Sequence, residues 1–252
     1  MKPKDQVLKV WGELACFTRP ELKVERFSYP VITPSAARGI YDAIYCKPKE
    51  FRWQITKIEL LKPPSYIALR RNEVKEKISV NDVSEFMSGK KYPEPIWADG
   101  DERSNYYGAD KKGRTQRQTM ALKNVCYRLH AEIRPWPGFE DRVQGLEMQF
   151  RRRAVNGKCI YQPYFGCREF PAYFELIEPD QTLGEPSSID IDNLGWMLYD
   201  VFNLSEPYDL STWKENNHNL FISLFKPIVS NGVLVVPPYE SKEVLKPERG
   251  ER

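Results

Sequence analysis

The feature that most constrains the fold is a strand, a helix and a second strand within about the first sixty residues. Residues 7–17 are rich in β-branched, aromatic and apolar side chains and alternate in their first half, which is typical of a half-buried strand. Gly12 within it indicates a bulge or a close approach of backbone. Residues 33–45 begin with a capping threonine followed by proline and repeat small or apolar side chains at helical spacing. Residues 51–61 then alternate as a second strand, so the order predicts one half of a split β-α-β fold.

The other half of that fold is predicted further along the chain. Residues 122–133 and 171–177 alternate as strands, and residues 146–154 fit a second helix. Together with the first three elements, they predict an α+β fold with a ferredoxin-like, RRM-like sheet.

The remaining segments define the expected domains. Residues 70–120 carry many Lys, Asp, Asn and Gly residues with poor periodicity, which predicts a long surface insertion of loop character. Residues 195–201, 220–228 and 233–236 resemble strand and helix pieces of a small unit, followed by a polar tail. We therefore expect a ferredoxin-like domain over residues 1–178, with its insertion around 62–119, and a small β-rich C-terminal domain over residues 179–252.

Charge is unevenly distributed along the chain, although its net value is only +3. Residues 103–158 contain thirteen Lys or Arg against five Asp or Glu, whereas residues 175–252 contain six against fourteen. Such asymmetry indicates a surface for a polyanion in the middle of the chain and a solvated or protein-facing module at its end. The alternative is that these charges only solvate loops.

Composition excludes several classes of protein. No run of eighteen apolar residues exists and the first seven residues are polar, so we expect neither a membrane span nor a secretory signal but a cytoplasmic protein. The five cysteines are widely spread, which favours reduced structural thiols. Standard catalytic signatures are absent, and two histidines are too few for a histidine-rich metal site. We expect no cofactor and no metal. RNA cleavage by its own 2′-hydroxyl fits this, because a base, an acid and a cationic clamp suffice.

Basic side chains are the candidate RNA ligands. The densest group is the run Arg151, Arg152 and Arg153, and guanidinium groups both clamp phosphates and stack on bases. At most two of three consecutive helical arginines can face one RNA backbone, and the third is expected to meet solvent or Glu147. A solvated helix face is the alternative. The full predicted set is Lys47, Arg70, Arg71, Arg114, Arg117, Arg151, Arg152, Arg153, Lys158 and Arg168.

Three further side chains are interpreted one by one. Tyr45 stands at the end of the first helix, where it either buries its ring and caps the helix or contacts a ribose or phosphate with Lys47 beside it. His130 lies within an alternating strand, where a half-buried structural histidine is the usual case. His218 lies in a polar stretch and is expected at the surface.

Several ordered strings resemble the Cas five protein of subtype I-C CRISPR systems, a member of the RAMP superfamily. These strings are LKVWGELACFTRPE at 8–21, KVERFS at 23–28, PSAARGIYDAI at 34–44 with YCKP after it, RRNEV at 70–74, FRRRA at 150–154 and GCREFPAYF at 166–174. The resemblance spans most of residues 7–240. It implies a ferredoxin-like RNA-binding domain with a small β-rich C-terminal domain.

The resemblance also implies an activity and partners. Members of this family cut precursor CRISPR RNA at the base of each repeat hairpin without metal, leave a 2′,3′-cyclic phosphate and retain the 5′ handle. They then cap a filament of backbone subunits beside a large subunit that reads target DNA, so double-stranded DNA is a further expected contact.

The catalytic set of the family is matched in part. It combines a tyrosine closing the first helix, which Tyr45 matches, with a Lys-His pair ahead of the arginine-bearing helix, where this sequence has Gly145 and Leu146. Three explanations stay open. Another basic residue supplies the missing groups, with Lys123, His130 and Arg142 as candidates; or cleavage is slow and Tyr45 and the arginines only position the RNA; or the protein is a binding subunit without cleavage.

Overall fold

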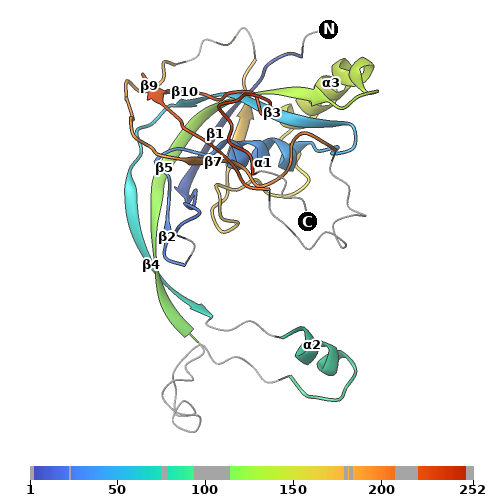
Figure 1. The fold of residues 1–252 in the computed structure, drawn as a ribbon, viewed down its shortest axis with the longest axis vertical. Coiled ribbons are helices and arrows are strands. Elements are labelled where there is room, and N and C mark those ends of the chain that lie inside the picture. Colours follow the sequence, from blue (N-terminus) through green and yellow to red (C-terminus); the bar gives the residue numbers. More distant parts are fainter. Residues whose placement is uncertain are drawn as a thin grey trace. The chain divides into compact units, whose positions relative to one another are not determined.

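The computed structural model describes residues 3–22, 24–74, 79–93, 114–178, 181, 184–207 and 221–247, without the side chains of residues 74, 114 and 115. The chain divides into two compact units, one of residues 1–67 and 120–252 and one of residues 68–119. It is a mixed α and β protein, in which a large antiparallel sheet carries few helices (Figure 1).

The large sheet has the strand order β6-β1-β5-β3-β10-β9, and β2 and β4 also pair with β5. Its strands are β1 (Gln6–Ala15), β2 (Arg26–Phe27), β3 (Phe51–Leu60), β4 (Tyr66–Val74), β5 (Arg114–Pro135), β6 (Tyr173–Leu176), β9 (Val229–Ser230) and β10 (Val233–Val235). β1 pairs with β5 and β6, and β3 pairs with β5 and β10, all in the antiparallel sense. A separate pair is formed by β7 (Met197–Asp200) and β8 (Ser223–Phe225). The chain passes through α1 between β1 and β3, and through α3 between β5 and β6.

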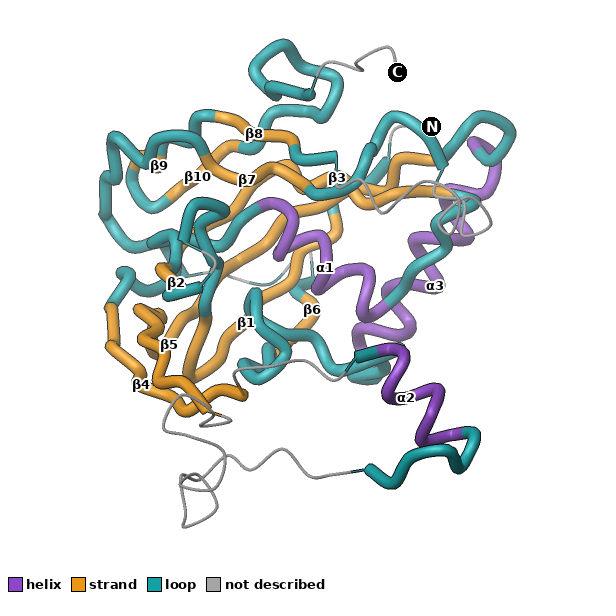
Figure 2. The backbone as a smooth tube through the Cα atoms, turned by 60° about the horizontal axis from the view of Figure 1, so that its bottom comes forward, coloured by secondary structure: helices purple, strands orange, loops and turns teal. Residues whose placement is uncertain are grey.

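Two helices of the larger unit pack on one face of the sheet (Figure 2). α1 (Pro34–Ile44) contacts β3, and α3 (Val143–Val155) contacts β6 and α1; the short 3-10 helix Glu140–Arg142 precedes α3. α1 begins where the Thr33 hydroxyl accepts a hydrogen bond from the Ala36 N–H at 3.2 Å, with Pro34 at the first helical position. α2 (Val80–Met87) lies in the smaller unit.

The core between helices and sheet is aromatic. Trp53 of β3 lies 4.9 Å from Tyr41 of α1 and 4.7 Å from Phe150 of α3, measured between ring centroids. All three side chains are fully buried. The Tyr41 hydroxyl reaches two carbonyl oxygens, those of Gln6 and Leu129, each at 2.8 Å, so its polar group is satisfied inside the core. This cluster fixes the end of α1 against the sheet.

Most sequence predictions of elements are confirmed. The predicted strands at 7–17, 51–61 and 171–177 and the helices at 33–45 and 146–154 exist within a few residues of their predicted bounds, whereas the strand predicted at 122–133 is longer than expected, because β5 begins eight residues earlier, at Arg114. At Gly12 the close approach is confirmed, because a Cβ there would lie 2.8 Å from the Phe165 ring and 2.8 Å from the Pro171 carbonyl oxygen.

The prediction of loop character for residues 70–120 was wrong for much of that segment. Arg70 and Arg71 lie in β4, Arg117 lies in β5, and α2 forms between them; residues 75–78 and 94–113 are outside the described part. None of the side chains described between residues 70 and 118 is buried, and the half-buried positions of this part of β4 are taken by Arg71 and Glu73, so the apolar periodicity that reveals a half-buried strand is missing. The predicted C-terminal pieces form the strands β7, β8 and β10, and no helix is found among the described residues of that part.

Candidate functional site

Tyr45 ends α1 and is held from several sides. Its N–H donates to the Tyr41 carbonyl at 2.9 Å, and its own carbonyl accepts from the Trp53 indole N–H at 2.9 Å. Its ring packs on Phe51 at 5.6 Å between centroids, and only 8% of the residue is exposed. The ring is therefore buried, as the structural alternative predicted, and the phenol group lies at the edge of the turn 45–51.

Three charged residues surround this turn. The Lys47 ammonium lies 2.9 Å from one Glu50 carboxylate oxygen, and an Arg142 guanidinium nitrogen lies 3.3 Å from the other. The hydrogen bond to Glu50 raises the pKa of Lys47, and the Tyr45 phenol adds to this. Lys47 and Arg142 in turn lower the pKa of Glu50. The side chains of Lys47 and Arg142 are 44% and 63% exposed, so both cations remain accessible to a phosphate. We call Tyr45, Lys47, Glu50 and Arg142 the Tyr45 cluster.

The Tyr45 cluster supplies proton donors and positive charge. A phenol and an ammonium can donate hydrogen bonds to a phosphate or to a leaving oxygen, and a guanidinium can stabilise negative charge that develops on the phosphate. No histidine of the described residues belongs to the cluster. The arrangement therefore fits electrostatic stabilisation and acid catalysis better than general-base catalysis at neutral pH.

His130 and Lys123, two predicted partners of Tyr45, are not brought to it. His130 follows Leu129, whose face of β5 meets the helices, so its side chain points to the opposite face of the sheet. There it is buried between Asp5 at 2.7 Å and Glu59 at 3.1 Å. Lys123 is exposed near the middle of β5, roughly 40 Å along the strand from Pro135, the residue that pairs with Phe51. Arg142 alone of the three predicted partners joins the cluster.

The three arginines of α3 point to different partners. Arg151 forms an ion pair with Glu178 and lies 3.5 Å from the Gln6 amide oxygen. Arg153 donates through Nε to the Ile44 carbonyl at 2.6 Å, so it caps the C-terminus of α1 next to Tyr45. Arg152 is exposed. The sequence predicted that at most two of the three face one RNA backbone and that the third meets solvent or Glu147; in the structure Arg153 caps a helix and Arg151 is paired with Glu178.

The other predicted RNA ligands are spread over both units. Lys158 and Arg168 are exposed in the segment after α3. In the smaller unit, Arg70 is exposed, Arg71 is half-buried, Arg117 lies 3.1 Å from Glu73, and Arg114 is in β5 with its side chain outside the described part. These positions leave Lys158, Arg168, Arg152 and Arg70 as exposed cations.

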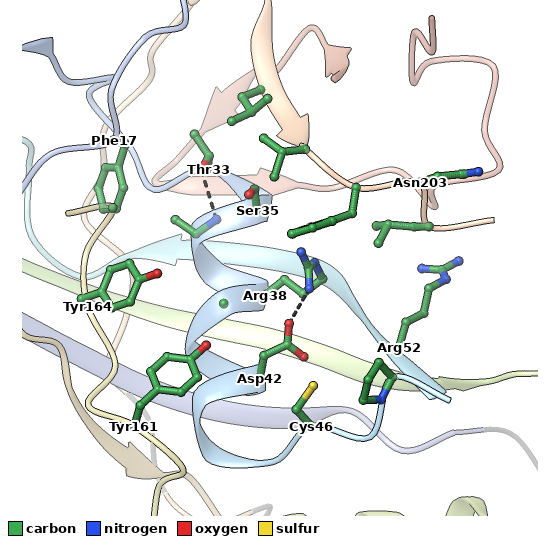
Figure 3. A pocket seen from close by; sticks show the side chains of 18 of the residues that line it. Phe17, Thr33, Ser35, Arg38, Asp42, Cys46, Arg52, Tyr161, Tyr164 and Asn203 are labelled. Carbon is green, nitrogen blue, oxygen red and sulfur yellow. Dashed lines mark hydrogen bonds and ion pairs between the residues drawn. The ribbon is translucent and has the colours of Figure 1, made fainter. Parts of the chain in front are cut away.

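A cavity of about 760 Å³ lies beside α1 within the larger unit (Figure 3). It is lined by α1, by residues 160–166, by residues 198–206 and by the turn that carries the Tyr45 cluster, through Cys46, Pro48 and Phe51. Figure 3 shows the hydroxyls of Tyr161 and Tyr164 pointing into this space, with Arg38 and Asp42 facing them from α1.

An ion-pair network forms one wall of the cavity. Arg38 binds Asp200 through Nε at 2.7 Å and Nη2 at 3.1 Å, and it also pairs with Asp42. Burial raises the pKa of Asp42 against the opposing effect of Arg38. Burial together with Asp42 raises the pKa of the Cys46 thiol to about 12. Burial lowers the pKa of Arg38, but Asp200 and Asp42 more than offset this and raise it above its ordinary value.

Within the described part of the chain, no group of three or more His, Cys, Asp or Glu side chains is placed to hold a metal ion. Nor is any described helix long and apolar enough to cross a membrane.

Sequence reasoning missed Glu50 and the cavity. The spacing Lys47 to Glu50 within one turn was the available signal for the first. The cavity had no such signal, because its walls come from segments more than one hundred residues apart.

Comparison with known proteins identifies the class of this chain. A family model described as CRISPR-associated protein (Cas_Cas5) matches residues 7–237, which is most of the sequence. The chain therefore belongs to the Cas5 family of CRISPR-associated proteins, in its Cas5d group. It is 39% identical over 242 residues to the CRISPR pre-crRNA endoribonuclease Cas5d of Mannheimia succiniciproducens, covering 94% of this chain and 96% of that protein. It is 38% identical over 200 residues to the protein of the same name from Thermus thermophilus, covering 79% and 74%.

Solved structures agree on the fold. A crystal structure of a CRISPR-associated protein matches with a TM-score of 0.61 and 19% identity, over 96% of this chain and 97% of that one. A protein from Streptococcus mutans matches with a TM-score of 0.57, 19% identity and the same coverage. At this level of identity the two structures support the shared fold alone.

Proposed function

We propose that this protein binds the repeat hairpin of precursor CRISPR RNA and cuts it without metal, retaining the 5′ handle. The observation that carries the proposal is the similarity over nearly its whole length to a protein named CRISPR pre-crRNA endoribonuclease Cas5d. The Tyr45 cluster supports it, because accessible cations surround a phenol at the position that the resemblance assigns to catalysis.

In the proposed mechanism the Tyr45 cluster acts on one phosphate of the RNA. The 2′-hydroxyl of the preceding ribose attacks the phosphorus atom, the bond to the 5′-oxygen breaks, and a 2′,3′-cyclic phosphate forms. Arg142 and Lys47 stabilise the charge on the phosphate, and Lys47 or Tyr45 donates the proton that the leaving 5′-oxygen needs. Water or hydroxide takes the proton of the 2′-hydroxyl.

We further propose that the larger unit contains a ferredoxin-like, RRM-like domain. The order β6-β1-β5-β3, with α1 and α3 in the two crossovers on one face, supports this. The boundary between residues 178 and 179 and the β-rich C-terminal domain stay predictions. The expected contacts also stay predictions: the 5′ handle, the backbone and large subunits of a type I-C complex, and double-stranded DNA. The location in the cytoplasm is a prediction too.

A second candidate function is RNA binding without cleavage in the same complex. Its support is that Gly145 and Leu146 stand where the family pattern has Lys-His, and that His130 is paired with Asp5 and Glu59 on the opposite face of the sheet from Tyr45. Loss of a general base typically costs about 10²- to 10⁴-fold in rate, which slows cleavage without abolishing it.

One experiment separates the two functions. The purified full chain is mixed in excess with a radiolabelled repeat hairpin carrying both flanks, in EDTA, and single-turnover cleavage is followed. A single cut at the 3′ base of the hairpin, with a cyclic phosphate on the 5′ product, supports processing. Tight binding with no product after long incubation supports the binding subunit.

The rate of cleavage is expected to keep rising with pH through neutrality and not to level off there. Because the raised pKa of Lys47 keeps it protonated in neutral and mildly alkaline solution, the acid stays available while hydroxide becomes more abundant. The single-turnover rate should rise from pH 6 to pH 9, by up to about tenfold per pH unit. A rate that levels off near pH 6.5, the ordinary pKa of histidine, would instead indicate a histidine base.

RNA affinity is expected to depend on Arg152 through charge alone. Arg152→Ala removes an exposed cation of α3, so the hairpin should bind more weakly and the slope of log K against log salt should fall by about one. Arg151→Ala is the matched comparison and should have a smaller effect, because Arg151 already pairs with Glu178. Binding titrations at several salt concentrations measure both; equal slopes for Arg152→Ala and the wild type would contradict the assignment.

A further inference from the structure

The cavity beside α1 begins at the Tyr45 cluster. Phe51 lines it and packs on Tyr45, and Cys46 and Pro48 of the same turn line it too. Its volume of about 760 Å³ lies within the range of roughly 300–1,000 Å³ that small-ligand sites occupy. The turn that carries the Tyr45 cluster therefore also forms part of the cavity wall, although the four residues of the cluster do not line the cavity themselves.

The walls of the cavity suit a flat aromatic ligand. Tyr161 and Tyr164 stand on one side with ring centroids 6.4 Å apart and planes inclined by 35°, and Phe51 and Trp136 add two further rings. Tyr161 is 47% exposed, so its ring is available at the mouth. Aromatic side chains of this kind bind unstacked bases of single-stranded RNA.

Polar groups in the cavity can recognise the edge of such a ligand. The hydroxyls of Tyr161 and Tyr164 point into it opposite Arg38 and Asp42 (Figure 3). Burial raises the pKa of Tyr161, and the charge of Asp42 adds to this, so the phenol stays neutral and can both donate and accept. A nucleobase edge also presents donors and acceptors side by side, which matches this mixture better than a purely apolar ligand does.

Gly39 keeps the α1 side of the cavity open. It lines the cavity in the middle of the helix, and a Cβ built there would meet no atom within 4 Å. Glycine inside a helix lowers stability relative to alanine, and no close packing at Gly39 requires it. A larger side chain at Gly39 would extend into the cavity that Tyr161 and Tyr164 also line.

We propose that this cavity binds one unpaired nucleobase of the RNA, turned out of the stack next to the phosphate that the Tyr45 cluster acts on. The inference rests on the proposed processing function and adds to it a base-specific contact beside the cut. The base lies between the Tyr161 and Tyr164 rings and the Gly39 face of α1. Its edge meets the hydroxyls and the Arg38–Asp42 pair.

The test combines protein variants that fill the cavity with RNAs that lack one base. Gly39→Leu places a side chain in the space, whereas Gly39→Ala adds one methyl group and serves as the matched control; both raise helix propensity. Each full-length variant is titrated with the repeat hairpin and with a series of hairpins that lack one flanking base at a time. At one flanking position, loss of the base should weaken binding to the wild type about tenfold. Gly39→Leu should bind the intact RNA more weakly than the wild type does, by the same factor. Removal of that base should not weaken the binding of Gly39→Leu any further.

Other outcomes overturn the inference. If Gly39→Leu binds intact RNA as tightly as Gly39→Ala does, the base is bound elsewhere. The same follows if the loss of affinity from Gly39→Leu and the loss from removing the base multiply. Neither result contradicts the proposed processing function. If Gly39→Leu keeps its RNA affinity but no longer binds the other subunits of its complex, the cavity seats a protein side chain. Should Gly39→Leu fail to fold, Tyr161→Ala replaces it, with the same expected loss. A wild type that does not bind the hairpin at all removes the proposed function as well.

Discussion

Tyr45→Phe is expected to slow cleavage of repeat RNA by about 100-fold while leaving RNA affinity unchanged. Phenylalanine keeps the ring on Phe51 and both backbone hydrogen bonds of residue 45, so the turn retains its shape. Only the hydroxyl beside Lys47 is lost, and with it a donor to the phosphate or the leaving oxygen. Single-turnover cleavage in EDTA measures the rate, and a binding titration with the same RNA measures affinity.

Tyr173→Phe is the control for this variant. Tyr173 is 52% exposed on β6 and lies outside the Tyr45 cluster, so the same chemical change there should leave the rate within about twofold of the wild type. If Tyr45→Phe also stays within that range, Tyr45 is only a buried cap of α1. Catalysis would then have to come from other groups.

Local signals explain why the elements around the site could be predicted. α1 could be predicted from Thr33, Pro34 and a helical repeat of small residues, because each of these acts on the backbone next to it. β1 and β3 show alternation because one of their faces packs against the helices. β4 has no buried side chain, and its half-buried positions after Leu69 are taken by Arg71 and Glu73, so no apolar alternation marks this part, which was therefore predicted to be a loop.

The roles of single side chains at the site depend on contacts between distant segments. Arg153 caps α1 because the sheet brings two helices together that are about one hundred residues apart in the chain. Arg142 reaches Glu50 for the same reason. His130 was a reasonable candidate by residue type. Because successive side chains of a strand point to opposite faces of the sheet, however, its position in β5 places it on the face opposite Tyr45. A sequence supplies candidates of the right chemistry, and the register of the sheet decides which of them meet.

Asp200→Ala is expected to lower the free energy of unfolding by about 3–5 kcal/mol. Asp200 is almost fully buried, binds Arg38 of α1 through both oxygens and accepts hydrogen bonds from two backbone N–H groups, those of Val201 and Phe202. Without it, a largely buried guanidinium keeps only Asp42 as a carboxylate partner, and two partly buried donors lose their acceptor. Urea unfolding at pH 7, followed by tryptophan fluorescence, measures the change.

Two comparison variants show whether the loss comes from the uncompensated charge. Asp192→Ala removes an exposed carboxylate nearby in the sequence and should change stability by no more than about 0.5 kcal/mol. The triple variant Arg38→Met with Asp42→Leu and Asp200→Leu removes the whole ion-pair network and should lose clearly less than Asp200→Ala alone, because no ion of the network is left without its partner. If the triple variant is the less stable of the two, packing rather than charge joins α1 to β7, and the ion pairs contribute little to the wall of the cavity.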